Sequence, residues 1–143
     1  YYAPAACSLA VHIVAHEAGL PVELVKVDLD THRLEDGTDY HSINPRGYVP
    51  LLELEDGTRL TEVTAIVQYL ADLAPAAGLL PPAGTLARVH VQEWLTFVSS
   101  ELHKAFSPWL WHKETAESTK QAVKLRLARH FGELDRRFAQ QPY

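Results

Sequence analysis

A proline-rich segment from Pro75 to Pro82 separates two parts of the sequence that differ in hydrophobic pattern. Before this segment, short apolar stretches switch between the alternation typical of strands and the spacing typical of helices. After it, apolar residues recur only at helical spacing. We therefore predict an α/β domain over residues 1–74, a linker over 75–85 and an all-helical domain over 86–143.

The first part contains the signals of a small mixed sheet with helices packed on it. In its first helix the apolar residues Leu9, Ile13 and Val14 recur at helical spacing, and Gly19 stands where that helix should end. Asp56-Gly57 is a strong signal for a hairpin turn between two strands. The resulting order suits two α/β connections, a hairpin and a closing helix. Residues 1–6 are predicted to be the end of a strand that leaves through a loop, and the following helices and strands are predicted, in chain order, at residues 8–18, 21–27, 49–54, 58–61 and 61–73.

In the second part, the spacing of apolar residues predicts two long amphipathic helices, over residues 86–109 and 115–138. Their apolar stripes are formed by Val89, Leu95, Val98, Leu102 and Phe106 in the first helix and by Val123, Leu127, Phe131, Leu134 and Phe138 in the second. A hairpin of two such helices leaves apolar surface uncovered, so we expect further helices to complete this domain in the natural protein. The sequence also lacks an initiator methionine, and we expect the natural start to lie elsewhere.

Composition narrows the classes of partner. Residues 1–75 carry 12 of the 18 acidic residues but only 4 of the 13 Lys and Arg, which argues against a nucleic-acid partner there. No apolar run approaches the roughly 20 residues that a membrane-spanning helix needs, so no membrane partner is expected. The single cysteine, Cys7, cannot form an internal disulfide, and this favours the reducing cytoplasm.

Two features near the predicted strands and helices suggest a reactive or binding site. Cys7 directly precedes the first helix, where the helix dipole favours a thiolate; the alternative is that Cys7 is a small buried apolar residue. Val49-Pro50 begins a strand. A cis bond there would leave backbone groups of Val49 available to an extended peptide, although most bonds before proline are trans.

Three further positions allow a functional and a structural interpretation. Glu62 is either an ordinary acidic residue at a helix start or a partner for a ligand's ammonium group, with the helix N-terminus binding the ligand's carboxylate. His103, in the middle of a helix, is either a ligand contact or a residue at the edge of the core. His12 and His16 lie one helical turn apart, but no third ligand is evident, so no metal site is expected.

Taken together, these segments are similar to one protein family. The opening Tyr1-Tyr2-Ala-Pro-Ala-Ala-Cys7-Ser8-Leu9 and the segment Asn44-Pro45-Arg46-Gly47-Tyr48-Val49-Pro50 are specific motifs. Leu60-Thr61-Glu62 with the helix behind it, and the region from Glu93 to Lys104, extend the similarity over essentially all of the chain. The sequence resembles the bacterial, cysteine-containing beta-class glutathione transferases.

This resemblance implies a glutathione transferase fold, with a thioredoxin-like α/β domain followed by an all-α domain that is incomplete here. It implies an enzyme that conjugates glutathione, as cosubstrate, to small hydrophobic electrophiles, with additional thiol–disulfide activity, no permanently bound cofactor and a homodimeric state in the cytoplasm. Two alternatives remain open. One is a binding or dimerisation module without turnover; the other is a glutathione-dependent isomerase or dehalogenase on the same fold, for which Ser8 beside Cys7 is relevant.

The resemblance also implies roles for individual residues. Cys7 and, from the helical domain, His103 would contact the glutathione sulfur as the catalytic residues. Val49, before Pro50, would pair with the cysteinyl backbone, and Glu62 with the N–H of Val63 would hold the γ-glutamyl end. His32 stands near the position where the family often has Lys, and would supply a pH-dependent charge to the glycyl carboxylate. The remaining implied substrate contacts are Thr96, where the family often has Asn, Ser100 and Lys104.

Overall fold

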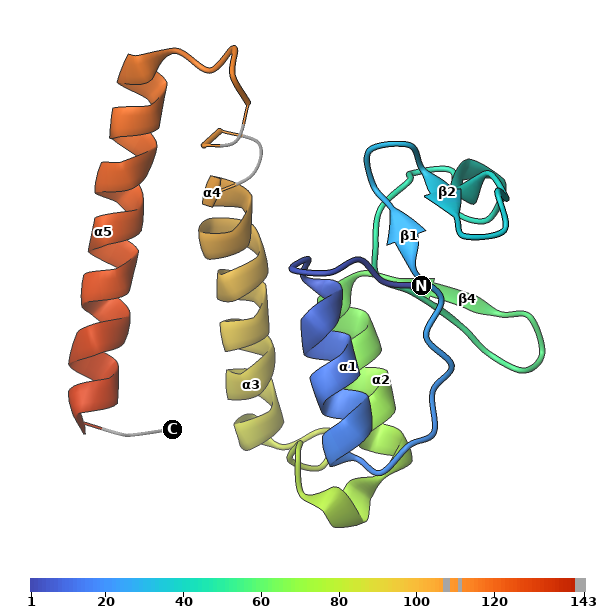
Figure 1. Ribbon diagram of the computed structural model, residues 1–143. Helices are drawn as coiled ribbons and strands as arrows, with labels where there is room; N and C mark the ends of the chain where they lie inside the picture. The colour runs from blue at the N-terminus through green and yellow to red at the C-terminus, as the bar shows by residue number, and fades with distance from the viewer. Residues whose placement is uncertain (107–108, 111, 141–143) are drawn as a thin grey trace. The chain divides into compact units, whose positions relative to one another are not determined.

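The computed structural model describes residues 1–106, 109–110 and 112–140 (Figure 1). The chain divides into two compact units, Tyr1–Arg88 and the part that begins at Val89. Among the described residues, no helix is both long and apolar enough to cross a membrane.

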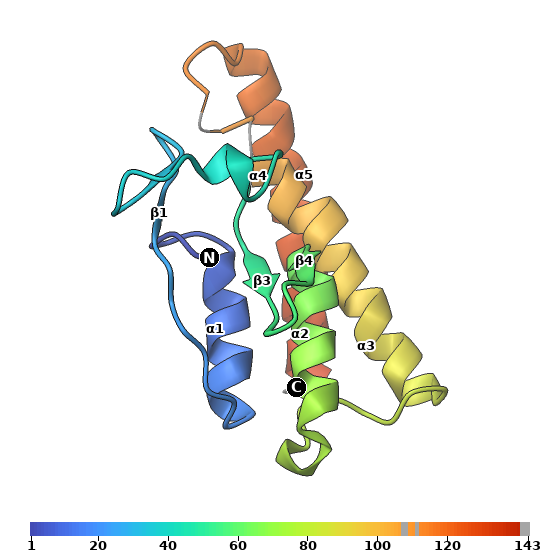
Figure 2. The same cartoon turned by 90° about the vertical axis from the view of Figure 1, so that its right-hand side faces the viewer.

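Two helices, α1 (Ser8–Glu17) and α2 (Val63–Leu73), lie side by side in the first unit (Figures 1 and 2). They pack through a cluster of Ala15, Ile66 and Leu70, all nearly inaccessible to water. Both helices were predicted, and their ends lie close to the predicted ones. Of the apolar residues predicted for α1, Val14 packs against this cluster, but Leu9 and Ile13 are exposed, while Ser8 and Ala15 are buried.

The strands form two antiparallel pairs that the start of the chain connects. β1 (Val27–Asp28) pairs with β2 (Arg33–Leu34), and β3 (Leu51–Glu53) pairs with β4 (Arg59–Thr61). The Tyr2 N–H donates to the Val25 carbonyl and the Val27 N–H to the Tyr2 carbonyl, while the Leu51 N–H donates to the Tyr1 carbonyl. The start of the chain therefore lies between residues 25–27 and β3.

The strand predicted over 21–27 is largely wrong. Regular strand begins only at Val27, and Lys26 joins through a single parallel bridge to Tyr2. Val22 and Leu24 alternate with polar residues as a half-buried strand would, yet both are exposed. Pro21 has no N–H to donate, and the pairing segment offers only Tyr2 to this part of the chain.

A second cluster, of Ala3, Val27, Tyr40 and Val49, fixes the loop that leads to β3. Tyr40 belongs to a short 3₁₀ turn, η1 (Tyr40–Ser42), and is completely buried. Its hydroxyl donates to the Tyr48 carbonyl at 2.8 Å, and the side-chain amide of buried Asn44 donates to the same oxygen at 2.7 Å. These bonds hold residues 44–50 against the core.

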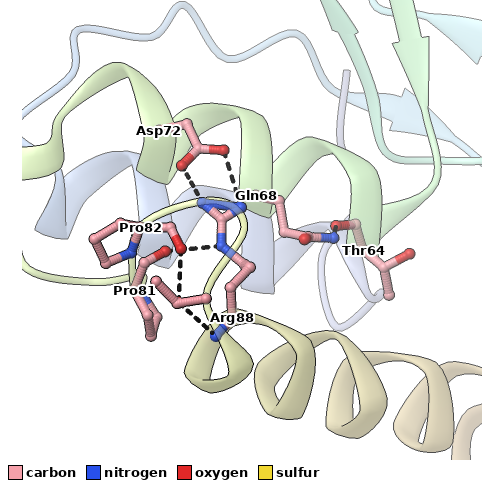
Figure 3. A network of polar contacts seen from close by, with 7 residues as sticks. Thr64, Gln68, Asp72, Pro81, Pro82 and Arg88 are labelled. Atoms are coloured by element: carbon pink, nitrogen blue, oxygen red, sulfur yellow. Dashed lines mark hydrogen bonds and ion pairs between the residues drawn. The ribbon is translucent and has the colours of Figure 1, made fainter.

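The segment after α2 is held to α2 by contacts of Arg88 (Figure 3). It contains a short 3₁₀ turn, η2 (Pro75–Ala77). The Arg88 guanidinium, whose side chain is 7% exposed, pairs with both carboxylate oxygens of Asp72 and donates to the Pro81 carbonyl at 2.9 Å. The Arg88 N–H donates to the Thr85 hydroxyl.

The second unit consists of helices that run antiparallel. Its elements are α3 (Leu86–Phe97), which begins in the first unit, the π-helical segment η3 (Val98–His103), α4 (Lys104–Phe106) and α5 (Glu117–Gln140). The core of this unit is formed by Leu102, Ala105, Val123 and Leu127.

The single helix predicted over 86–109 is interrupted by η3. A π turn holds more residues per turn than an α turn, so side chains beyond it rotate away from a straight stripe. Leu102 lies in the core and Phe106 packs against it, as predicted, whereas Val89, before η3, and Val98, at its start, are exposed. The predicted end at residue 109 follows residues 107 and 108, which lie outside the described residues. In α5, Val123 and Leu127 are buried as predicted, but Phe131 and Phe138 are exposed.

Candidate functional site

Cys7 occupies the N-cap position of α1. Its side chain is partly buried, and Sγ lies 3.4 Å from the Val49 carbonyl oxygen, to which the thiol donates. The sequence placed this thiol at the start of a helix, and the structure confirms that position. Because the first N–H groups of a helix point toward its N-terminus, a sulfur anion there would be stabilised.

The peptide bond between Val49 and Pro50 is cis. The general preference for a trans bond before proline therefore does not hold here. In the described part of the chain, the Val49 N–H has no hydrogen-bond partner. Val49 thus presents a backbone donor beside the carbonyl that faces Cys7, which is the arrangement that an extended peptide needs for pairing.

Glu62 is the N-cap residue of α2 and has φ +71°. A positive φ is uncommon for a residue with a side chain, and such conformations concentrate at functional sites. The Glu62 carboxylate is 71% exposed and lies 3.5 Å from the Arg46 guanidinium. Next to it, Val63 and Thr64 are the first residues of the helix, and their backbone N–H groups have no acceptor within it. One carboxylate and a set of backbone donors thus lie at one helix start, ready for an ammonium group and a carboxylate.

His32 lies against Gly47, the residue that follows Arg46. It has φ +52°, and its ring packs against that of His41 in a tilted arrangement, with centroids 4.4 Å apart. The space for a Cβ on Gly47 is filled by these two rings, with His32 Nδ1 and His41 Nε2 each 2.9 Å from the Cβ position. Because Gly47 has φ +67°, both its conformation and its surroundings require glycine.

One loop, residues 44–50, therefore contacts each part of the site within the first unit. Val49 bonds to Cys7, Arg46 pairs with Glu62, and Gly47 packs against His32. Sequence reasoning had named Cys7, Val49, Glu62 and His32 but had missed Arg46 and His41. Arg46 lies inside the Asn-Pro-Arg-Gly motif, which was the available signal for it, whereas nothing in the sequence pairs His41 with His32.

The other predicted site residues belong to the second unit. Thr96 is exposed on α3, and its hydroxyl donates to the Gln92 carbonyl one turn earlier. Ser100 and His103 are exposed in η3, and Lys104 is exposed at the start of α4. Their roles stay predictions. Within the described ranges, no three His, Cys, Asp or Glu side chains come close enough to hold a metal ion.

The comparison with known families identifies the first unit. Residues 6–73 match the family described as "Glutathione S-transferase, N-terminal domain". Glutathione S-transferase GstA from Escherichia coli O157:H7 is 49% identical over 127 residues, which are 89% of this chain and 63% of GstA. The chain belongs to the glutathione S-transferase family. The similarity to this family that the motifs suggested is confirmed.

Solved structures confirm the glutathione transferase fold for the whole chain. The structure of BphK, a bacterial GST in a ternary complex, superimposes with a TM-score of 0.96 at 49% identity and covers 100% of this chain and 71% of BphK. The bacterial beta class glutathione S-transferase of Sphingomonas chungbukensis superimposes with a TM-score of 0.92 at 42% identity, over 99% of this chain and 70% of that protein. A thioredoxin-like domain and a helical part, as predicted, are thus confirmed, and the chain spans about two thirds of these transferases.

Proposed function

We propose that this chain binds glutathione beside Cys7 and that the natural protein conjugates it to small hydrophobic electrophiles. The observation that carries the proposal is the loop of residues 44–50, because it contacts Cys7, Glu62 and His32 at once. A solved sphingomonad glutathione S-transferase of 43% identity is complexed with glutathione and covers 96% of this chain, which supports the same ligand here.

Glutathione presents chemical groups that match this arrangement. Its γ-glutamyl ammonium group would pair with the Glu62 carboxylate, and the adjacent carboxylate would accept from the Val63 N–H at the start of α2. The cysteinyl backbone would pair with Val49 in the manner of an added strand. The glycyl carboxylate would reach His32. With these contacts the ligand sulfur would lie near Cys7, at the start of α1.

The chemistry requires that the thiol of bound glutathione be ionised near neutral pH. The N-terminus of α1 favours a sulfur anion, and we infer that His103 of the helical unit donates a hydrogen bond to it. The thiolate sulfur then forms a bond to an electrophilic carbon, and the displaced group leaves with its electron pair. In this scheme Thr96, Ser100 and Lys104 would contact the substrates from the second unit.

Cys7 also supports a thiol–disulfide reaction. Its thiolate would attack one sulfur of oxidised glutathione, so that a mixed disulfide forms and one glutathione thiolate leaves. This chain has no other cysteine to displace the bound half, so the adduct persists until a second glutathione thiol attacks it.

We infer a homodimer without a permanently bound cofactor. We also infer a cytoplasmic location, because the single cysteine suits a reducing compartment. Sedimentation that finds only monomer at micromolar concentration would contradict the dimer.

Calorimetry with glutathione tests the binding site through Glu62→Gln. Losing one charge-assisted contact should weaken binding by about 1–3 kcal/mol and leave the fold unchanged. The matched control is Glu55→Gln, an exposed residue of the β3–β4 turn, which should bind like the wild type. Equal affinity for both variants would show that Glu62 is an ordinary residue at a helix start.

Intact-mass spectrometry and a panel of electrophiles test the role of Cys7. The wild type incubated with oxidised glutathione should gain the mass of one glutathione, and Cys7→Ala should gain none. Conjugation should survive in part in Cys7→Ala, because the backbone contacts to glutathione remain. Glutathione binding without turnover of any electrophile by the full-length protein would favour a binding module instead.

A further inference from the structure

The contact between the His32 and His41 rings leaves one ring nitrogen in an environment that the proposed function does not use. The Nδ1 atom of His32 is buried and has no hydrogen-bond partner among the described residues. Its ring is held from one side by the His41 ring, at 4.4 Å between centroids and an angle of 50°, and it lies against buried Gly47. A polar atom without a partner inside a half-buried ring limits where that ring can carry a proton.

The proton position on His41 follows from its contact with Asp39. The backbone N–H of His41 donates to the Asp39 carboxylate at 3.0 Å and holds the pKa of that carboxyl below its usual range. The same oxygen lies 3.3 Å from Nδ1 of His41. An ionised carboxylate can only accept, so Nδ1 of His41 carries a proton in this contact.

His32 has no comparable acceptor. In the part of the chain that the structure describes, no carboxylate pairs with it, since Asp39 faces His41 instead. The neighbouring cations are engaged elsewhere: Arg33 donates to the Gly37 carbonyl and Arg46 pairs with Glu62. A proton on Nδ1 of His32 would therefore be a buried donor without an acceptor among the described residues.

We propose that His41 is a positioning residue that holds the His32 ring with Nδ1 unprotonated and its N–H at Nε2. His32 then donates a hydrogen bond from Nε2 to a carboxylate. This inference rests on the proposed function only where it names the ligand group, the glycyl carboxylate of glutathione. The proton position itself depends on the contacts of His32 and His41 alone.

Nitrogen NMR of the ¹⁵N-labelled chain reads the proton position directly. Two-bond proton–nitrogen correlations of His32 should show an unprotonated Nδ1 and a protonated Nε2, both without ligand and with S-methylglutathione, which lacks a reactive thiol. His41→Ala removes the stacked ring and should expose Nδ1, so that the signature changes to a mixture of forms. His41→Phe keeps a ring in place and should retain the wild-type signature. A protonated Nδ1 in the wild type, or an unchanged signature in His41→Ala, would overturn the proposal.

Binding of S-methylglutathione separates this inference from the proposed function. His32→Gln places an amide donor near the position of Nε2 and should bind within about threefold of the wild type, whereas His32→Leu should bind about tenfold more weakly. Wild-type affinity in His32→Leu would overturn the role of His32 as a donor. Absence of binding in the wild type would instead refute the proposed function, while the NMR signature would still decide the proton position.

Discussion

Aspartates in the first unit hold turns by accepting backbone N–H groups from residues that follow them. Asp28 is the strongest case, because its Oδ1 accepts from the N–H groups of Asp30 and Thr31 at 2.9 and 3.2 Å. The backbone N–H of Thr31, and after it that of Asp30, lowers the pKa of this carboxyl below the ordinary value. The turn after β1 is thus more stable when Asp28 is ionised.

Asp28→Asn should make the free energy of unfolding vary less with pH in the acid range. The pKa of Asp28 is lower in the folded than in the unfolded state, so its stabilisation is complete above the ordinary value of about 4 and is lost as pH falls through the folded-state pKa. Urea unfolding from pH 2 to 7 should therefore find Asp28→Asn less stable at pH 7 and equal to the wild type at the acid end. Asp30→Asn, an exposed neighbour, is the control and should follow the wild-type curve. Parallel curves for Asp28→Asn and wild type would contradict this role.

How far the sequence predicts the site depends on the kind of contact. The positions of Cys7 and Glu62 were predictable because each stands at a helix start, and that of Val49 because it lies just before β3, which local patterns reveal. The contact between His32 and His41 was not, since it depends on the loop that turns through Gly47. The positive φ at Glu62 also has no sequence signal, because glutamate does not favour that conformation.

At the scale of elements, periodicity located the helices better than it identified their buried faces. The ends of α1, α2 and α5 lie near the predicted ones because apolar spacing and stop signals are local. The break of the long helix at η3 was not predicted, since a π turn follows from packing and leaves no pattern in single residues. The strand over 21–25 failed for a related reason: alternation signals a strand only where a partner strand is present.

The start of α3 offers a prediction at this scale. Arg88→Ala removes a buried guanidinium that pairs with three oxygens of Asp72 and Pro81, and should lower the free energy of unfolding by about 2–3 kcal/mol (Figure 3). Arg88→Lys should lose less, because it keeps the charge but not the planar fork.

Arg59→Ala is the matched control for Arg88→Ala. Arg59 pairs with Glu53 at 2.7 Å, but its side chain is 41% exposed, so its loss should cost no more than about 1 kcal/mol. Urea unfolding of the three variants and the wild type gives the comparison. A similar small cost for Arg88→Ala and Arg59→Ala would mean that burial adds nothing to the Arg88 contacts.

At the scale of the whole molecule, the chain carries a separate probe in each compact unit. The only cysteine, Cys7, lies in the first unit, whereas the three tryptophans follow residue 88 in the sequence. Each unit also has its own buried apolar residues, with Ile66 fully buried in the first and Leu127 4% exposed in the second. Thiol labelling and tryptophan fluorescence should therefore follow the unfolding of different parts of the chain.

Ile66→Ala and Leu127→Ala form a matched pair for this test. Each removes a large buried aliphatic side chain, at an expected cost of about 2–5 kcal/mol to the unit that contains it. Ile66→Ala should lower the urea midpoint for labelling of Cys7 and leave the fluorescence midpoint nearly unchanged, whereas Leu127→Ala should do the reverse. The result would mean that the first unit keeps its stability independently of the helical unit. Equal shifts of both probes in both variants would instead indicate one cooperative transition, in which the two units unfold together.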